Sequence, residues 1–175
     1  MEKADTDKTR LDLWPFMLSV YARPGIAAAC LRLQEAHGLD IPLMLAVLHG
    51  GVSGRVPGLE QIQAFDRNCR IWREAAILPL REARRTMKSH QWLASQPRVP
   101  SLREHVKAAE LEAERVEADV LEQMLSDILP GPRLIDLDGL SEITVTVLDL
   151  YDPGRTERVP PEVNTIVAAV LQTVE

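Results

Sequence analysis

Apolar side chains recur every three or four positions along most of the chain, and prolines, glycines and aspartates separate the repeats. This spacing places the apolar residues of each repeat on one face of a helix. The repeats predict helices over residues 12–22, 24–37, 40–51, 59–93, 101–129, 138–151 and 160–175. Such a chain is expected to fold as a bundle of helices.

Residues that favour helix ends support several of these boundaries. Asp40 is expected to cap its helix, and Pro24 fits a first helical position, where its missing N–H costs least. Ser101 and Glu104 have the spacing of a capping box, in which each side chain bonds to a backbone N–H of the other residue. Pro79 is expected to kink the longest predicted helix, because proline removes a helical hydrogen bond.

Helix and strand compete over residues 138–151. Residues 143–148 alternate as a β-strand does, yet apolar residues from Leu140 to Leu150 also share one helical face. A lone strand would have no partner, so we expect a helix that Asp138 caps, with the short strand as the alternative. The predicted fold is therefore all-α, a single-domain multi-helix bundle of about seven or eight helices with no sheet.

The chain divides into three predicted segments. Residues 1–9 are polar and are expected to be disordered. Residues 10–129 form the predicted helical core domain, and residues 130–175 form a C-terminal helical extension packed on that core. At 175 residues the chain is long enough to bury a core of this kind.

The predicted helix 101–129 has the most regular apolar repeat. Its apolar positions are expected to face the core, namely Leu102, Val106, Ala109, Ala113, Val116, Val120 and Met124. Glu110 and Glu114 lie four residues apart and could share a hard cation, but no oxygen ligands from another helix can be identified. We expect them to belong, with Glu117, to a solvated acidic face.

Aromatic residues make up 4% of the chain, yet three of them fall within residues 14–21. One apolar face of this predicted helix carries Trp14, Met17, Leu18 and Tyr21. The helix is apolar nearly all round, which requires contact on more than one side. We expect Trp14 and Tyr21 to face the core. The alternative is an interface with a partner, because aromatic residues beside an arginine, here Arg23, are favoured anchors.

Composition and charge indicate a globular protein. Hydrophobic residues make up 46% of the chain and charged residues 26%, and the formal net charge is −6. Residues 55–107 are basic, whereas residues 108–175 are strongly acidic. Within one compact domain, these two segments are expected to attract each other rather than separate partners.

The expected compartment is the cytoplasm. The N-terminus lacks the apolar run of a signal peptide, and no apolar stretch is long enough to span a bilayer, so no membrane association is predicted. Cys30 and Cys69 lie within apolar helical patterns and suggest no disulfide framework, which favours a reducing compartment.

No motif of a known catalytic or metal site occurs. The four histidines lie on different predicted elements, and neither Cys-x-x-Cys nor His-Glu-x-x-His is present. His49-Gly50-Gly51 resembles the start of an esterase oxyanion loop, but the Gly-x-Ser-x-Gly elbow is missing. The glycine-rich residues 49–58 lack the ending of a phosphate-binding loop. No cofactor is predicted, and catalysis is left open but not favoured.

A basic stretch gives one further hypothesis. Its cations are Arg67, Arg70, Arg73, Arg81, Arg84, Arg85 and Lys88. Arginine beside the aromatic rings of Trp72 and Trp92 could bind phosphate or nucleic acid. The chain as a whole is acidic, so the favoured interpretation is that residues 67–88 pair with the acidic residues 104–122 within the molecule.

Several segments resemble a family of short bacterial proteins without an assigned function. They are the stretch from Leu13 to Gly51, Ile71-Trp72-Arg73, Pro79-Leu80-Arg81, Arg84-Arg85 and the run AELEAER from Ala109 to Arg115. The resemblance covers roughly residues 10–125. It implies a bacterial, cytoplasmic helical domain and supplies no catalytic residue.

The favoured function is that of a non-enzymatic interaction or regulatory protein, with a protein partner or a second copy of the chain. The first alternative is a small-molecule binder or enzyme with a pocket between helices, and the second is nucleic-acid binding through residues 67–88. The candidate interaction or pocket residues are Trp14, Tyr21, Arg23, His49, Trp72, Arg73, Arg81 and Arg84.

Overall fold

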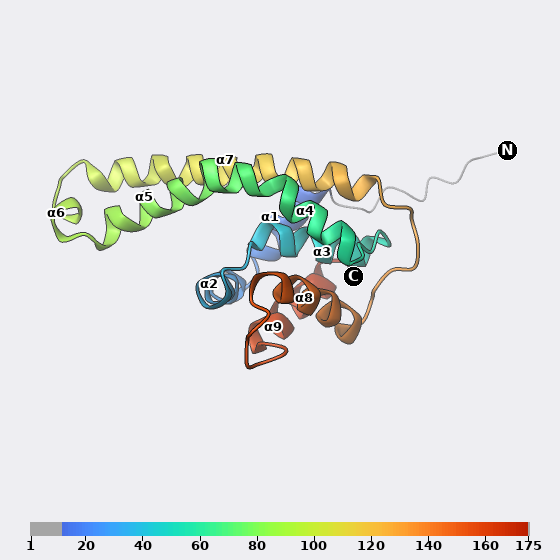
Figure 1. The fold of residues 1–175 in the computed structure, drawn as a ribbon. Helices are drawn as coiled ribbons and strands as arrows, with labels where there is room; N and C mark the ends of the chain where they lie inside the picture. Colours follow the sequence, from blue (N-terminus) through green and yellow to red (C-terminus); the bar gives the residue numbers. More distant parts are fainter. Residues whose placement is uncertain (1–11, 175) are drawn as a thin grey trace.

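The computed structural model describes residues 12–174, and every regular element within them is a helix (Figure 1). The elements are α1 (Leu13–Tyr21), α2 (Ile26–His37), α3 (Ile41–Ser53), α4 (Leu59–Trp72), the π-helical η1 (Arg73–Ile77), α5 (Leu78–Ser89), α6 (Gln91–Ala94), α7 (Val99–Ser126), α8 (Leu137–Tyr151) and α9 (Pro161–Val174). The all-α prediction is confirmed, and residues 143–148 lie within α8. The prediction for residues 1–9 lies outside the described residues.

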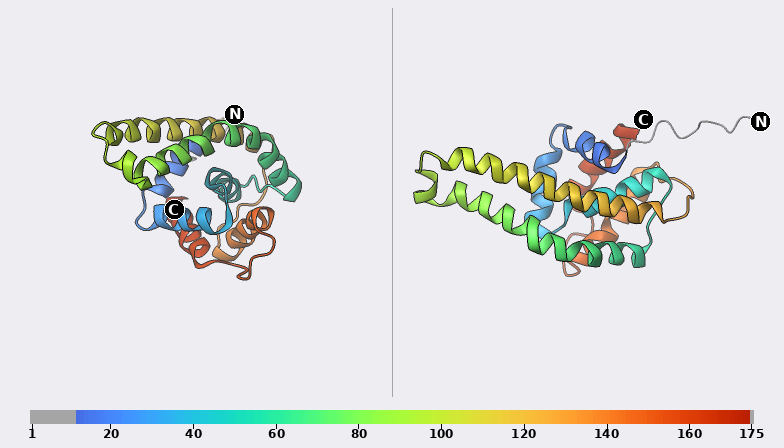
Figure 2. Two further views of the ribbon diagram at one scale, coloured as in Figure 1. Left: turned by 60° about the vertical axis from the view of Figure 1, so that its left-hand side comes forward. Right: turned by 90° about the horizontal axis from the view of Figure 1, so that it is seen from above.

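Helix α3 is the centre of the bundle. All residues from Ile41 to Leu48 are buried, because this run has no polar face and needs neighbours on every side. The left view of Figure 2 shows α3 end-on, with the other helices arranged around it. The buried core draws residues from α1, α2, α3, α4, α7, α8 and α9. No helix in residues 12–174 combines the length and the apolar character that crossing a membrane requires.

A long antiparallel hairpin lies along one side of the bundle. The continuous stretch α4–η1–α5 forms its first arm and α7 its second (Figure 1). Its outer end, made of α5, α6 and the first turns of α7, projects beyond the other helices in both views of Figure 2. No residue of α5 or α6 is buried, in keeping with this projection.

The first arm of the hairpin is interrupted just before Pro79. Proline has no N–H to donate to the carbonyl of Ala75, one helical turn earlier. The backbone widens there into the π-helical η1, and α-helix resumes at Leu78. The predicted kink therefore takes the form of a π-helical segment, a feature frequently found at functional sites. The arm also ends earlier than predicted, at Ser89.

Two predicted helix starts are wrong because a neighbouring residue controls the backbone. Helix α2 begins at Ile26, since Gly25 adopts a left-handed conformation (φ 82°) that keeps Pro24 outside the helix. Helix α7 begins at Val99 with proline in its first turn, so Ser101 lies inside the helix and forms no cap.

Aspartates cap α3 and α8. Asp40 accepts a hydrogen bond from the Leu43 N–H at 3.1 Å, which confirms the predicted cap of α3. At α8 the cap is Asp136, which accepts from the Gly139 N–H at 2.7 Å, and Asp138 lies in the first turn instead.

The predicted inward face of α7 is wrong. The buried residues of this helix are Glu110, Ala113, Glu117, Ala118, Leu121 and Leu125, so the helix turns two carboxylates toward the molecule. Leu102, Val116 and Val120 of the predicted stripe are exposed instead. The helix is rotated this way because arginines of the opposite hairpin arm face the glutamates.

Candidate functional site

Arg73 is the centre of a buried cluster of charged side chains. It is the first residue of η1, and only 8% of its surface is exposed. Nη1 donates to Asp66 Oδ1 at 2.9 Å, and Nη2 lies 3.1 Å from Asp40 Oδ2 and 3.0 Å from Glu117 Oε1. One guanidinium therefore joins α4, α7 and the start of α3.

Asp66 links this cluster to α8. The Tyr151 hydroxyl, at the end of α8, donates to Asp66 Oδ1 at 2.7 Å. Arg70 donates to the other carboxylate oxygen at 2.5 Å, and the guanidinium of Arg73 lies 5.9 Å from the centre of the Tyr151 ring. Charge-assisted bonds of this kind are among the stronger hydrogen bonds in proteins.

The carboxylates of the cluster differ in their affinity for protons. Burial raises the pKa of Glu117 to about 8, and the charge of the nearby Asp40 adds to the rise. Burial also raises the pKa of Asp40. For Asp66 burial acts in the same direction, but the hydrogen bonds from two arginines and a tyrosine outweigh it and lower its pKa. Burial therefore favours a proton on the Asp40–Glu117 pair near neutral pH.

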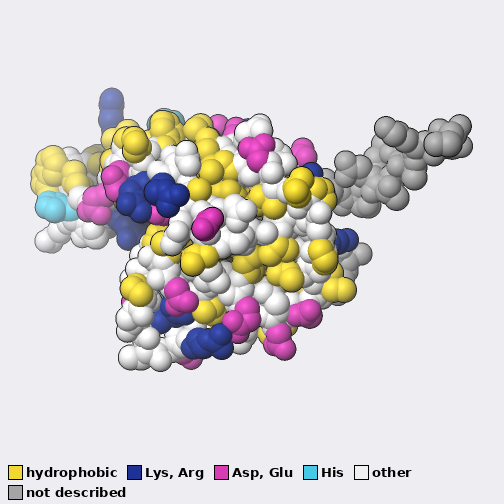
Figure 3. Space-filling view, turned by 45° about the vertical axis from the view of Figure 1, so that its right-hand side comes forward, with side chains coloured by type: hydrophobic (Ala, Val, Ile, Leu, Met, Phe, Trp, Pro, Cys, Tyr) yellow, Lys and Arg dark blue, Asp and Glu magenta, His cyan; other side chains and the backbone are white. Residues whose placement is uncertain are grey.

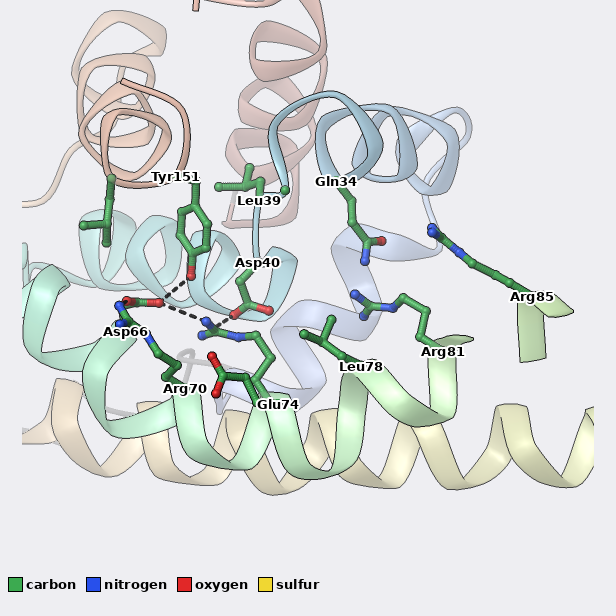
Figure 4. A pocket seen from close by; sticks show the side chains of 13 residues that line it. Gln34, Leu39, Asp40, Asp66, Arg70, Glu74, Leu78, Arg81, Arg85 and Tyr151 are labelled. Carbon is green, nitrogen blue, oxygen red and sulfur yellow. Dashed lines mark hydrogen bonds and ion pairs between the residues drawn. The ribbon is translucent and has the colours of Figure 1, made fainter. Parts of the chain in front are cut away.

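A polar cavity of about 410 Å³ opens beside this cluster, and we call it the polar cavity. Asp40, Asp66, Arg73 and Tyr151 line its inner side. Gln34 of α2 and Arg81 of α5 face each other at one end of it in Figure 4. Most polar groups of the cluster bond to one another, and among its buried atoms only Arg73 Nε and Glu117 Oε2 have no hydrogen-bond partner within residues 12–174, so a structural role is the main one for these side chains.

A second cavity of about 350 Å³ lies between α1, α2, α3, α5 and α7, and we call it the apolar pocket. Its apolar lining consists of Trp14, Met17, Leu18, Tyr21, Ala27, Leu31, Ile41, Pro42, Leu45 and Leu111. The four α1 residues are those that the sequence places on one helical face. The pocket is therefore largely a hydrocarbon and aromatic surface.

Charged side chains of the hairpin form the remaining wall of the apolar pocket. Arg81 donates from Nε to Glu110 at 3.0 Å and from Nη2 to Glu114 at 2.8 Å. Arg84 forms two hydrogen bonds to Glu110, the longer at 3.3 Å. Lys107 also lines the pocket and forms no ion pair with residues 12–174. These contacts confirm the predicted pairing of the basic and acidic segments.

Gln34 and Arg81 line both cavities. With its amide oxygen turned toward Arg81, Gln34 accepts from Nη1 and, at 3.1 Å, from Nε. The two side chains thus form a shared wall between the polar cavity and the apolar pocket.

The structure brings five of the eight candidate residues to the two cavities. Trp14, Tyr21, Arg81 and Arg84 line the apolar pocket, and Arg73 lines the polar cavity. Trp14 is half-buried and packs against the core, whereas Tyr21 is 42% exposed, so the expectation that both face the core is confirmed for Trp14 and wrong for Tyr21. Both form part of a pocket wall.

The other three candidates lie elsewhere. Arg23 donates to Thr173 at 2.8 Å and to the carbonyl of Gln172 at 2.7 Å, which ties the α1–α2 turn to α9. His49 is half-buried behind α1, with its ring centre 4.8 Å from that of Phe16. Trp72 donates from Nε1 to the Ala113 carbonyl at 2.9 Å, outside both cavities.

Sequence reasoning missed the roles of Asp66, Glu117 and Tyr151, and it placed Glu110 and Glu117 on a solvated face. That expectation is wrong, since both glutamates are buried. One signal in the sequence pointed to the pairing of these glutamates with arginines. The basic residues 73, 81 and 84 share a helical face on one segment, and the glutamates share a face on another.

The described residues show no group of three or more His, Cys, Asp or Glu side chains placed to hold a metal ion. Cys30 and Cys69 are free and buried, and burial raises the pKa of each thiol to about 12. Both cysteines are thus protonated packing residues.

Comparison with known proteins places this helical body in a family. A search of curated proteins and a search of solved structures each found no match. A family model described as a protein of unknown function, DUF2390, matches residues 12–121, which contain both walls of the apolar pocket and four of the five residues of the buried cluster. The chain therefore belongs to the DUF2390 family of proteins of unknown function.

Proposed function

We propose that the apolar pocket binds a small amphipathic molecule with an apolar body and one anionic group. The observation that carries the proposal is the pairing of a wall of apolar side chains from three helices with a wall of cations. A volume of about 350 Å³ is in the range of small-molecule sites. Concave apolar surfaces with a few convergent polar groups are typical of such sites.

The charges at the pocket favour an anion over a cation. Arg81, Arg84 and Lys107 supply three positive charges, and Glu110 and Glu114 supply at most two negative ones. Burial raises the pKa of Glu114, which weakens its negative charge further. Lys107, which has no ion pair within residues 12–174, is the cation best placed to meet a carboxylate or phosphate group.

The experiment is a thermal-shift screen of the purified protein against medium-chain fatty acids and aromatic carboxylates, with titration calorimetry of those that stabilise it. Ligands that bind the folded state raise its melting temperature. Uncharged alcohols of matching carbon skeleton are expected to bind less tightly, because they lack the anionic group.

Two neighbouring alanines of α2 provide matched variants. Ala27 lines the pocket and Ala28 does not, and both are exposed. Ala27→Trp is expected to fill the pocket and weaken binding by about tenfold or more, whereas Ala28→Trp leaves affinity unchanged. Equal effects of the two variants, or no stabilisation by any amphipathic anion, would rule the proposal out.

A paired test on α5 separates the charge contribution from the apolar one. Arg84 lines the apolar pocket, whereas Arg85 faces Glu35 at 3.6 Å and lines the polar cavity. Arg84→Gln is expected to reduce the preference for the carboxylate over the matching alcohol, and Arg85→Gln is expected to preserve it.

For the wider role, we propose a bacterial cytoplasmic protein that acts by binding rather than catalysis. The resemblance to short bacterial proteins and the two free, buried cysteines support this setting. Nucleic-acid binding through residues 67–88 is less favoured, because Arg73, Arg81 and Arg84 pair with glutamates of α7. A gel-shift assay at low salt tests it directly.

A further inference from the structure

The outer face of α7 carries an apolar stripe that the described chain leaves largely uncovered. Its residues are Leu102, Val106, Ala109, Ala113, Val116 and Val120, and we call them the outer stripe. Ala113 is buried beside Trp72 and Val106 is half-buried, whereas the other four are exposed. The side chains of Leu102, Val116 and Val120 are 49%, 45% and 42% exposed. Hydrophobic atoms gather along the upper edge of the molecule in Figure 3, where α7 runs. None of the six residues lines the apolar pocket.

The spacing of the outer stripe is that of a helix that packs against another helix. Its residues follow one another at alternating intervals of four and three, as the inward positions of a coiled coil do. The pattern is also symmetric about residue 111. If a second α7 lies antiparallel, Leu102 faces Val120, Val106 faces Val116 and Ala109 faces Ala113 of the other copy. Of the two alanines at the centre, Ala113 is buried beside Trp72, so the small and exposed Ala109 is the one that can contact the other copy closely.

Charges beside the outer stripe favour the antiparallel arrangement. His105 lies on one flank near the N-terminal end, and Asp119 lies on the same flank near the C-terminal end. An antiparallel pair brings His105 of one copy beside Asp119 of the other. Glu112 of the two copies would meet at the centre, where Arg115 of each copy is within reach. In a parallel pair, residues on the same flank of the two copies lie on opposite sides of the interface, so His105 and Asp119 would not meet.

Trp72 adds an aromatic anchor at the edge of the outer stripe. Its indole bonds to the Ala113 carbonyl, which fixes the ring beside the centre of the stripe, and 39% of the residue is exposed. Tryptophan is enriched among the residues that dominate binding energies at protein interfaces.

We propose that the outer stripe pairs with the outer stripe of a second copy of this chain in antiparallel orientation, so that the protein is a two-fold symmetric dimer. Such an interface is isologous, since each residue meets its symmetry-related position on the other copy. The dimer is independent of the ligand proposed for the apolar pocket, because different faces of α7 are used.

Analytical ultracentrifugation of the full chain over a range of concentrations tests the dimer. The wild-type protein is expected to sediment as a dimer. Val116→Glu places a carboxylate opposite an apolar partner and is expected to raise the dimer dissociation constant at least about tenfold. Leu111→Glu is the matched control, because Leu111 has the same 45% exposure on another face of the same helix. This control is expected to leave the dimer intact.

A charge exchange tests the orientation. His105→Glu is expected to weaken the dimer, because it places a second carboxylate beside Asp119 of the other copy. Adding Asp119→Lys to His105→Glu is expected to restore it, since opposite charges then face each other again. In a parallel dimer these two positions lie on opposite sides of the interface, so adding Asp119→Lys would not restore association lost through His105→Glu.

Three results would overturn the proposal. A wild-type chain that stays monomeric at every concentration would refute the dimer. A dimer that survives Val116→Glu would place the interface elsewhere. Failure of the double charge variant to recover association would refute the antiparallel arrangement.

Discussion

A carboxylic acid buried beside a second carboxylate keeps its proton to a higher pH than one in water. Glu117 is in this position, with Asp40 on the same guanidinium of Arg73, and 1% of its surface is exposed. Its Oε2 atom has no hydrogen-bond partner among residues 12–174, so the buried carboxylate is incompletely solvated when ionised. Ionisation of Glu117 therefore lowers the stability of the folded state.

The pH dependence of the free energy of unfolding should show the effect of Glu117 ionisation. In the unfolded chain Glu117 loses its proton near its ordinary pKa of 4.5, whereas in the folded protein its pKa is about 8. Between these values the folded state binds the extra proton, so its contribution to stability falls as the pH rises. Glu117→Gln cannot ionise. Its free energy of unfolding is expected to decline less than that of the wild type between about pH 5 and pH 8.

Urea denaturation at a series of pH values measures this difference. Glu157→Gln, at an exposed position between α8 and α9, is the control and is expected to follow the wild-type curve. Parallel curves for Glu117→Gln and the wild type would contradict the assignment of the raised pKa to Glu117.

The burial of individual charges was the hardest feature to predict from the sequence. Glu110, Glu114 and Glu117 occupy one helical face, and a row of carboxylates usually faces water. Whether that face turns inward depends on Arg73, Arg81 and Arg84, which are remote in sequence and meet the glutamates only in the folded hairpin. The charge pattern predicts that the two segments pair, but it does not show that this pairing buries Glu110 and Glu117.

Elements are joined in this molecule by backbone contacts as well as by side chains. The end of α3 holds the connection between α7 and α8, because the Gly131 N–H donates to the Gly54 carbonyl at 2.6 Å and the Leu134 N–H donates to the Gly51 carbonyl at 2.9 Å. Gly54 ends α3 with a φ of 74°, a conformation that other residues rarely adopt. A β-carbon on Gly54 would lie 2.5 Å from the Gly131 oxygen.

Gly54→Ala is therefore expected to lower the free energy of unfolding by about 2 kcal/mol or more, through the left-handed backbone and the clash with the connection. Gly154→Ala is the control, because a β-carbon there would have no neighbour within 4 Å. This control is expected to change stability by less than about 0.5 kcal/mol. Chemical denaturation of both variants makes the comparison, and similar losses in the two would refute the argument.

Helices were predicted well where the signals are local. The apolar run of α3 and its cap at Asp40 lie within a few residues of each other, and α8 was chosen over a strand because a strand would have lacked a partner. The rotation of α7 about its axis was predicted wrongly. Its most regular apolar repeat faces outward, and only the arginines across the hairpin decide which side is buried.

At the scale of the molecule, the buried core continues beyond the segment that the family model matches. Helices α8 and α9 follow residue 121, yet Leu140, Val147, Val163, Ile166 and Val170 are fully buried in the same core as α1 and α3. The Tyr151 hydroxyl completes the buried cluster from this C-terminal part. The central α3 would lose its cover without them.

A chain that ends at residue 130 is therefore expected to be unfolded or aggregated. Large exposed apolar areas cannot be offset in a domain whose stability is a small difference between large terms. Circular dichroism and size-exclusion chromatography of the truncated chain check this, and co-expression of residues 131–175 as a separate piece is expected to restore soluble, helical protein. Cooperative unfolding of the truncated chain on its own would contradict it.

The two cavities could not be predicted from local sequence patterns, because they depend on residues that are remote in sequence. The sequence placed Trp14, Met17, Leu18 and Tyr21 together on one face of a helix, and they do line one wall of the apolar pocket. The opposite wall comes from α5 and α7, and nothing in the order of residues states that a gap remains between them. A space between elements is a property of packing, which depends on every helix at once.

The ion cluster around Arg73 also divides the hairpin into two parts that differ in their opening. Every residue that the cluster joins lies at or inside the level of η1, and no residue of α5 or α6 is buried. Separating α4 from α7 at the cluster would leave several charges without water, whereas the part of the hairpin beyond the Arg84–Glu110 pair can open at little cost. Backbone amides beyond that pair should therefore exchange hydrogen with solvent by local fluctuation, and those flanking Arg73 only when the whole molecule unfolds.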